Sequence, residues 1–260
     1  MFLNRKNINT YLFDVDGTIL VEGEILESTI EAIADLREEG NMVMLATGRC
    51  HSQLKEILDK IEVDGIVQNN GALATIGKEI LFQSPIDPEI IKQMVNDNLN
   101  LAVLTKDKYV RFINTNKCYK KFAESLNLEE PKKAALDLID KEPIYSLNVG
   151  DTDISKINIK KYQGLKFVKV SDYGYDAVNV GVNKASCFDA IEKKYPQGHI
   201  VAFGDNLNDL EMLDEAYCSV CMPTAPDACK KASSYVTRDA KLDGIAFAIN
   251  NFVKRVLEWN

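Results

Sequence analysis

Residues 10–18, which read TYLFDVDGT, decide how the rest of the chain is interpreted. The first four form a short apolar run that predicts a β-strand, and Asp14 follows directly where that strand ends. Asp16 lies two residues further on, on the same face of an extended segment. Gly17 allows the chain to turn closely after these two carboxylates. Asp and Gly after a strand often form only a turn, so the meaning of the pair depends on what else reaches it.

Outward from this stretch, predicted strands and helices alternate along the chain. MVMLA at 42–46 and GIV at 65–67 are continuous apolar runs, typical of strands buried on both faces. Helices are expected at 28–39, with Ser28 as the cap and Gly40 after the end, and at 52–60. After a middle region with another pattern, the alternation of strands and helices resumes at Asn183. Helices are expected at 183–194, 207–215 and 243–257, with the strands HIVAFG, SVCM and SYVT between them. This alternation predicts an α/β fold with a Rossmann-like, doubly wound and mostly parallel sheet.

The middle of the chain has a different pattern. ALATI and EILFQ flank a hairpin turn at 77–78, and Asp87 followed by Pro88 predicts the start of a helix that runs to about residue 99. LAVLT and YVRFI are expected to pair as strands, followed by helices near 117–126 and 154–162 and by the strands IYSLNV, LKFVKV and DAVNV. We therefore expect residues 84–181 to form an inserted α+β domain with a mostly antiparallel sheet, and residues 1–83 and 182–260 to form the core.

Acidic and polar residues gather where the predicted core strands end. Thr47, Gly48 and Arg49 follow MVMLA, Asn70 follows GIVQ, and HIVAFG leads into Asp205, Asn208 and Asp209. In a doubly wound sheet these strand ends meet at one edge, where ligands bind. The carboxylates of Asp14, Asp16, Asp205 and Asp209 would repel one another there without a cation. Mg²⁺ prefers such oxygen ligands together with substrate phosphate, so we expect a magnesium site.

The same edge carries groups that suit a phosphate. Thr47, Asn70 and the backbone amide beside Gly48 can donate hydrogen bonds to phosphate oxygens. Lys184, in VGVNK, supplies a positive charge. Phosphoryl transfer requires positioning and charge neutralisation more than elaborate covalent machinery, so this residue set favours that chemistry.

The motifs resemble those of a known family. DVDGT, LATGR at 45–49, NK at 183–184 and GDNLNDLEML at 204–213 are similar, in order, to the four signatures of haloacid dehalogenase (HAD)-type phosphatases. NNGA at 69–72 and TRDAKLDGIAFAI at 237–249 resemble the Cof-like, subfamily IIB branch of sugar-phosphate phosphatases, which implies an inserted cap of the C2B type. One departure is MPTA at 222–225, where relatives often have Gly-Asn-Ala.

The resemblance implies a role for each candidate residue. Asp14 would attack phosphorus to form an aspartyl-phosphate, and Asp16 would serve as general acid and then general base. Mg²⁺ would be held by Asp14, the main-chain carbonyl of Asp16 and Asp205, with Asp209 supporting it through water. The implied contacts to the phosphoryl group or the rest of the substrate come from Thr47, Gly48, Arg49, Asn70, Lys184 and Asn208.

Three functions are consistent with these residues. The first is a Mg²⁺-dependent phosphatase that hydrolyses small, sugar-phosphate-like metabolites. The second is a phosphomutase, because relatives with that activity keep the same two aspartates. The third is a phosphate-binding module that has lost catalysis, against which the intact Asp14, Asp16, Lys184 and Asp205 argue.

Composition limits the partners and the location. The net charge is −8, from 39 acidic and 31 basic residues, so a phosphate backbone would be repelled and no nucleic-acid partner is expected. The sequence has no apolar run long enough to span a membrane and no signal-peptide pattern at its start, so we expect no membrane partner and a cytoplasmic location. Cys218 and Cys221 form a CxxC within an apolar run, which favours structural thiols over a metal site. We expect a monomer or a homodimer.

Overall fold

The structure is a computed structural model that describes residues 8–112, 121, 124, 130–150 and 154–258. It divides into two compact units. The first contains the segments up to Gly48, Leu54–Phe82 and from Asn183 onward, and the second contains Arg49–Gln53 and Gln83–Val182. The segment Arg49–Gln53 packs as part of the second unit, where Cys50 is buried against Leu104 and Tyr109. That the second unit acts as a cap stays a prediction.

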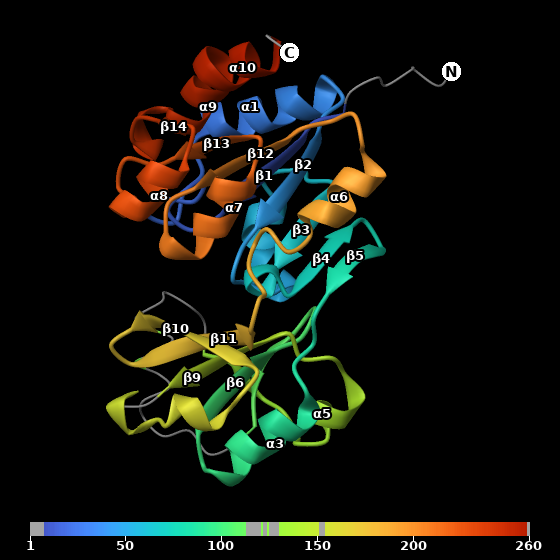
Figure 1. Cartoon of the computed structure of the whole chain (residues 1–260), viewed down its shortest axis with the longest axis vertical. Coiled ribbons are helices and arrows are strands. Elements are labelled where there is room, and N and C mark those ends of the chain that lie inside the picture. Colours follow the sequence, from blue (N-terminus) through green and yellow to red (C-terminus); the bar gives the residue numbers. More distant parts are fainter. Residues whose placement is uncertain (1–7, 113–120, 122–123, 125–129, 151–153, 259–260) are drawn as a thin grey trace. The chain divides into compact units, whose positions relative to one another are not determined.

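The first unit is built on one sheet with the strand order β14-β13-β12-β1-β2-β3-β4-β5 (Figure 1). Its strands are β1 (Thr10–Asp14), β2 (Met42–Ala46), β3 (Gly65–Gln68), β4 (Leu73–Ile76), β5 (Glu79–Gln83), β12 (Ile200–Gly204), β13 (Cys218–Cys221) and β14 (Tyr235–Val236). The six strands from β14 to β3 are parallel, and β4 runs antiparallel to β3. The order reverses between β1 and β12, so the predicted doubly wound sheet is confirmed.

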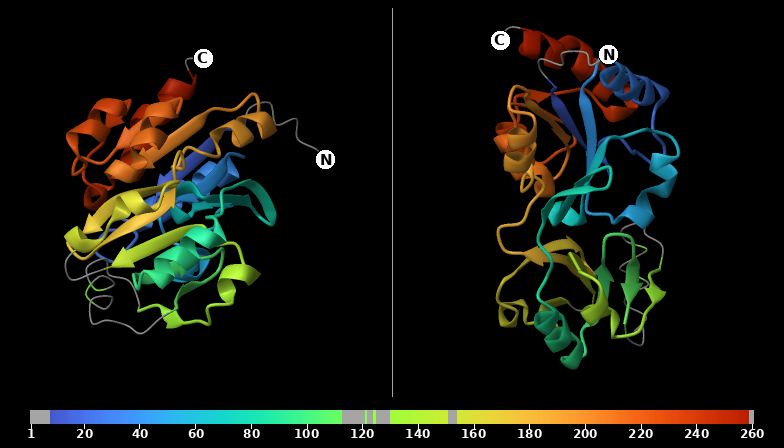
Figure 2. Two further views of the ribbon diagram at one scale, coloured as in Figure 1. Left: turned by 60° about the horizontal axis from the view of Figure 1, so that its bottom comes forward. Right: turned by 90° about the vertical axis from the view of Figure 1, so that its right-hand side faces the viewer.

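Helices cover both faces of this sheet, because apolar side chains alternate along its strands. Tyr11 and Phe13 of β1 enter one core cluster and Leu12 enters the other. The first face is covered by α1 (Glu27–Glu38), α2 (Lys55–Leu58), α9 (Gly244–Ala248), the π-helical turn η7 (Ile249–Val253) and α10 (Lys254–Glu258). The second face is covered by α6 (Phe188–Lys194), α7 (Leu210–Glu215) and α8 (Asp227–Ala232). In the right-hand view of Figure 2 the sheet lies between the blue α1 and the orange α6 and α7.

Several predicted helix boundaries in the first unit are wrong. Ser28 does not cap α1, which begins at Glu27, and the Ser28 hydroxyl instead donates to Asp243 Oδ1 at 2.6 Å. The helix expected at 52–60 is a 3₁₀ turn, η1 (His51–Leu54), followed by the short α2. The helix α6 begins only at Phe188, because the Asn183–Lys184 region forms turns, and the six-residue α8 was not predicted. Gly40, in contrast, follows the end of α1 with φ +89° as expected.

The second unit contains a six-stranded sheet with the order β10-β11-β9-β6-β7-β8. Its strands are β6 (Asn100–Leu104), β7 (Tyr109–Arg111), β8 (Lys132–Lys133), β9 (Ser146–Gly150), β10 (Leu165–Ser171) and β11 (Gly174–Asn179). All neighbouring pairs are antiparallel except β7 with β8, which confirms the expected sheet type. The helices α3 (Pro88–Asn96) and α5 (Leu138–Lys141) accompany it, and Asp87 caps α3 by accepting from the amide of Glu89 at 2.9 Å.

The helix expected at 154–162 is wrong. Two 3₁₀ turns occupy this segment, η3 (Ile154–Lys156) and η4 (Ile159–Lys161). The buried residues Ile157 and Tyr162 are five positions apart, which does not place them on one face of an α-helix. The helix expected near 117–126 falls almost entirely outside the described residues.

The CxxC cysteines lie on opposite faces of β13. Cys218 belongs to one core cluster and Cys221 to the other, and both are buried. They therefore cannot ligate one metal, which confirms the interpretation as structural thiols. Within the described part of the chain, no helix combines the length and apolar character that crossing a membrane requires.

Candidate active site

The ends of β1 and β12 bring together acidic residues that are far apart in the sequence. Asp14 is the last residue of β1, and Asp205 follows β12, which pairs in parallel with β1 at the point where the strand order reverses. One carboxylate oxygen from each of Asp14, Asp205 and Asp209 lies within 4.8 Å of the others. A Cβ at Gly17 would lie 2.3 Å from Asp205 Oδ2, so only glycine leaves room for this carboxylate.

Lys184 joins two of these carboxylates. Its Nζ lies 2.5 Å from Asp14 Oδ1 and 2.5 Å from Asp209 Oδ1. The Lys184 side chain has no exposed surface, which for a lysine requires compensating charges. The two ion pairs supply them, so this lysine and the two aspartates form one buried charged unit.

Asp209 has a further role that the sequence reasoning missed. Its second oxygen, Oδ2, accepts from the backbone amides of Asp205 and Asn206, each at 3.0 Å. Both oxygens of Asp209 therefore have protein partners, and the side chain fixes the loop after β12 as well as Lys184. The support of a metal through water, which was expected for Asp209, stays a prediction.

The pKa values of Asp14, Asp205 and Lys184 are all shifted from their usual values. Burial raises the pKa of Asp14 well above its usual value and the negative charge of Asp209 adds to this, against the opposing effect of Lys184. Burial and then the Asp209 charge raise the pKa of Asp205 to about 6. Burial alone would lower the pKa of Lys184, but Asp14 and Asp209 outweigh it and hold that pKa above its usual value, so the lysine stays protonated.

The donor set fits a divalent cation. Three carboxylates and one ammonium leave an excess of two negative charges when all are ionised. A hard doubly charged ion with oxygen ligands would neutralise this excess, and Mg²⁺ is such an ion. Burial and then the charge of Asp209 raise the pKa values of Asp14 and Asp205, and a bound cation would oppose both effects.

Four further predicted residues, Thr47, Gly48, Asn70 and Asn208, lie close together in the first unit. The Asn70 amide N–H donates to the Thr47 carbonyl at 3.0 Å, and Asn70 takes φ +54°. The Asn208 side chain donates to Asn70 Oδ1 at 3.4 Å. A Cβ at Gly48 would lie 3.0 Å from the same oxygen, so Gly48 allows the Asn70 side chain to approach.

Two predicted residues have different surroundings. Asp16 is exposed, in the tight turn after β1 where Leu20 donates its amide to the Val15 carbonyl at 2.8 Å. Arg49 belongs to the second unit, where its guanidinium donates to the Gln53 carbonyl at 3.1 Å. The contact between Arg49 and a substrate stays a prediction.

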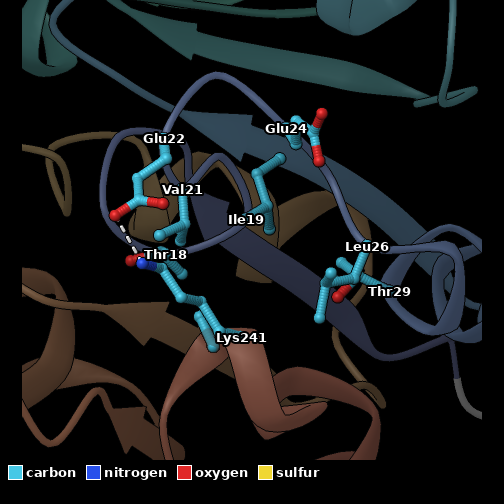
Figure 3. A pocket seen from close by; sticks show the side chains of 9 residues that line it. Thr18, Ile19, Val21, Glu22, Glu24, Leu26, Thr29 and Lys241 are labelled. Carbon is cyan, nitrogen blue, oxygen red and sulfur yellow. Dashed lines mark hydrogen bonds and ion pairs between the residues drawn. The ribbon is translucent and has the colours of Figure 1, made fainter.

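A cavity of about 440 Å³ lies beside the segment that begins at Thr18, two residues after Asp16 (Figure 3). It is lined by seven residues between Thr18 and Thr29 on one side and by Ala240 and Lys241 on the other, and an ion pair of 2.5 Å joins Glu22 to Lys241. Thr18 belongs to this lining and also donates to Asp205 Oδ1 at 3.4 Å. The segment is therefore linked both to the carboxylate cluster and to the C-terminal TRDAKLDG stretch.

Comparisons with known proteins agree with this geometry. The family model of haloacid dehalogenase-like hydrolases matches residues 11–249. The chain is 26% identical to YkrA of Bacillus subtilis over 245 residues, 91% of this chain and 95% of YkrA. It is 24% identical over 262 residues to the B. subtilis 5-amino-6-(5-phospho-D-ribitylamino)uracil phosphatase YcsE, which covers 97% and 100% of the two chains.

Solved structures share the fold. A protein from Geobacillus kaustophilus HTA426 superposes with a TM-score of 0.85 at 24% identity, over 94% of this chain and 98% of that one. The HAD subclass IIB sugar phosphatase BT4131 superposes with a TM-score of 0.77 at 23% identity and the same coverage. The match of the family model to most of the chain decides the classification: the chain belongs to the haloacid dehalogenase-like hydrolase family, as one of its phosphomonoesterases.

Proposed function

We propose that this enzyme is a Mg²⁺-dependent phosphatase that hydrolyses small phosphorylated metabolites through an aspartyl-phosphate on Asp14. The observation that carries the proposal is the buried Lys184, shared between Asp14 and Asp209 beside the carboxylate of Asp205. Such an arrangement holds a nucleophilic carboxylate in one orientation and offers one positive charge for a phosphoryl group.

In the first step a carboxylate oxygen of Asp14 attacks phosphorus, and the bond from phosphorus to the leaving oxygen breaks. Asp16 gives its proton to that oxygen, so the leaving group departs as a neutral alcohol. In the second step Asp16 takes a proton from water, the water oxygen attacks the phosphorus of the aspartyl-phosphate, and the Asp14 carboxylate is released with inorganic phosphate. The exposed position of Asp16 suits both proton transfers, since leaving group and water arrive from outside.

The remaining residues bind and orient. Lys184 and Thr47 would hold the non-bridging oxygens of the phosphoryl group, and Gly48, Asn70 and Asn208 would contact it or its neighbouring atoms. Asp14, Asp205 and the main-chain carbonyl of Asp16 would hold Mg²⁺, and Asp209 would support the ion through water. When bound, the ion would neutralise negative charge on the carboxylates and on the phosphoryl group. Arg49 and the second unit would contact the leaving group and exclude water.

The substrate class rests on chemistry and on relatives. YcsE and YitU of B. subtilis, at 24% and 26% identity, are named as phosphatases of 5-amino-6-(5-phospho-D-ribitylamino)uracil, a phosphorylated polyol derivative, and BT4131 is named as a sugar phosphatase. We propose a phosphorylated sugar or polyol of comparable size. An acidic protein surface favours such small substrates over a nucleic acid.

The test is phosphate release from a panel of sugar and polyol monophosphates and a generic aryl phosphate, with and without Mg²⁺. Wild type is expected to release phosphate only with the ion, and without any sugar bisphosphate activator. Asp14→Asn should abolish release, whereas Asp35→Asn on the exposed face of α1 should not. Unchanged turnover in Asp14→Asn contradicts the mechanism. A requirement for a bisphosphate activator would indicate a phosphomutase, and no release from any substrate would favour a binding module.

A further inference from the structure

Gly71 lies against the turn that carries Lys184. It takes φ +94° and follows Asn69 and Asn70, which both have positive φ as well. A Cβ built on Gly71 would lie 1.8 Å from the carbonyl oxygen of Asn183 and 2.9 Å from the amide nitrogen of Lys184. Atoms in ordinary van der Waals contact are separated by roughly 3.5–4 Å, so no side chain fits between these two backbones.

The carbonyl that Gly71 faces belongs to a turn that is otherwise closely held. The Asn183 carbonyl accepts from the Ser186 amide at 3.1 Å, and the Asn183 amide donates to Ser186 Oγ at 2.9 Å. The Asn183 side-chain oxygen accepts from the Ala185 amide at 2.8 Å. Displacing this carbonyl would therefore rotate the peptide that leads directly into Lys184.

A displacement of the Asn183 carbonyl would also affect the ion pairs of Lys184 with Asp14 and Asp209. Lys184 Nζ has two short ion pairs in a fully buried site, so a shift of its backbone cannot be absorbed by free rotation of the side chain. The amide of the preceding Asn70 also donates to the Thr47 carbonyl at 3.0 Å. The segment Asn70–Gly71 thus contacts both Thr47, which is expected to bind phosphate, and the turn at Asn183 that precedes Lys184.

We propose that Gly71 is a positioning residue, whose missing side chain sets where Lys184 stands relative to Asp14 and to the phosphoryl group. The proposal rests on the proposed function for its effect on turnover. Its effect on the position of Lys184 can be measured independently of any phosphatase activity.

The test compares Gly71→Ala with Gly40→Ala in the full-length protein. Gly40 has nearly the same backbone angle, φ +89°, but a Cβ there meets no atom within 4 Å among the described residues. Both variants therefore carry the cost of an alanine in the left-handed region, and only one also displaces the Asn183 carbonyl. Ser186→Ala is a milder second variant that loosens the same turn without a clash.

Three measurements are made on each protein. They are kcat/KM for an aryl phosphate, the affinity for inorganic phosphate in the presence of Mg²⁺, and the labelling rate of Lys184 by an amine reagent, followed by mass spectrometry. Gly71→Ala should lower kcat/KM by about 100-fold, the loss typical of a 1 Å misplacement. It should also weaken phosphate binding and speed the labelling of Lys184, while Gly40→Ala matches wild type in all three.

The outcomes separate this proposal from the proposed function. Wild-type values in Gly71→Ala, or equal losses in Gly40→Ala, overturn the positioning role. If Gly71→Ala does not fold, Ser186→Ala decides: faster labelling of Lys184 supports the role, and wild-type labelling and phosphate affinity overturn it. If wild type itself neither hydrolyses phosphate esters nor binds phosphate, the proposed function fails, and the labelling of Lys184 still tests Gly71.

Discussion

At the residue scale, one buried lysine organises the chemistry. Lys184 opposes the negative charge of Asp14 and Asp209, and Asp209 in turn holds the loop that presents Asp205. Asp16 stands apart from this unit in an exposed turn. The structure therefore separates the buried residues of the ion pairs from Asp16, whose side chain is exposed.

Asp16→Asn tests this separation. The change removes the proton donor for the leaving group but leaves the buried ion pairs intact. We expect turnover to fall by about 10²- to 10⁴-fold, the usual contribution of general acid–base catalysis. The free energy of unfolding should stay within about 0.5 kcal/mol of wild type, as for most exposed substitutions. Steady-state kinetics and urea titration measure the two effects, and unimpaired turnover would contradict the role of Asp16.

Lys184→Met should show the opposite balance. Methionine fills much of the same volume but leaves the carboxylates of Asp14 and Asp209 buried without their counter-charge. Removing one partner of a buried ion pair typically costs about 3–5 kcal/mol of stability, so we expect a loss of that size together with loss of activity. Urea titration in the absence of Mg²⁺ checks it. An unfolding free energy equal to that of wild type would mean that the ion pairs do not support the fold.

At the element scale, the site depends on strand ends and on the segment after β1. The parallel pairing of β1 with β12 sets the distance between Asp14 and Asp205, and stacking of Phe13 on Phe203, with ring centroids 4.6 Å apart, fixes that pairing from within the core. Beyond β1 the chain is supported differently. Residues between Thr18 and Glu24 border a cavity, and an ion pair joins Glu22 to Lys241 of its opposite side (Figure 3).

Lys241→Met measures how much that surface ion pair contributes. The side chains of Lys241 and Glu22 are 49% and 77% exposed, so solvent screens the pair, in contrast to the fully buried Lys184. Exposed pairs contribute about 0–1 kcal/mol, and we expect a loss of stability in that range. The same substitution at positions 184 and 241 thus compares a buried lysine that has two ion pairs with an exposed lysine that has one. A loss at Lys241 as large as the loss at Lys184 would contradict the account.

At the scale of the whole molecule, sequence pattern predicted the sheets better than the details of the site. Short apolar runs mark the strands, and the helices between them indicate which strands are parallel, so both sheet types and the meeting of Asp14 with Asp205 were expected. The 3₁₀ turns at 154–161 and the short α8 were missed because brief elements have little periodicity of their own. The two further bonds of Asp209 and the contact of Gly71 with Asn183 depend on packing between distant segments, which no local pattern contains.

Metal binding is expected to stabilise the whole first unit. Mg²⁺ would bind only the folded cluster of Asp14 and Asp205, so it shifts the unfolding equilibrium by mass action. At 100 times its dissociation constant a ligand adds about 2.7 kcal/mol, which raises the Tm of a chain of this size by about 5–10 °C. Thermal denaturation with Mg²⁺ against EDTA measures this shift. Asp205→Asn should remove most of it, and a full Mg²⁺ response in that variant would place the ion elsewhere.

The most direct test of the central claim is to find the phosphoryl group on Asp14. The Asp16→Asn variant is mixed with substrate and Mg²⁺, quenched in acid within the first turnover and digested for mass spectrometry. The substrate is an aryl phosphate, whose leaving group needs little protonation, so loss of Asp16 slows hydrolysis of the intermediate more than its formation. The peptide that contains Asp14 should therefore carry the mass of one phosphoryl group, and Asp14→Asn should carry none. A phosphoryl group on another residue, or turnover in Asp16→Asn with Asp14 unmodified at every quench time, would contradict the account.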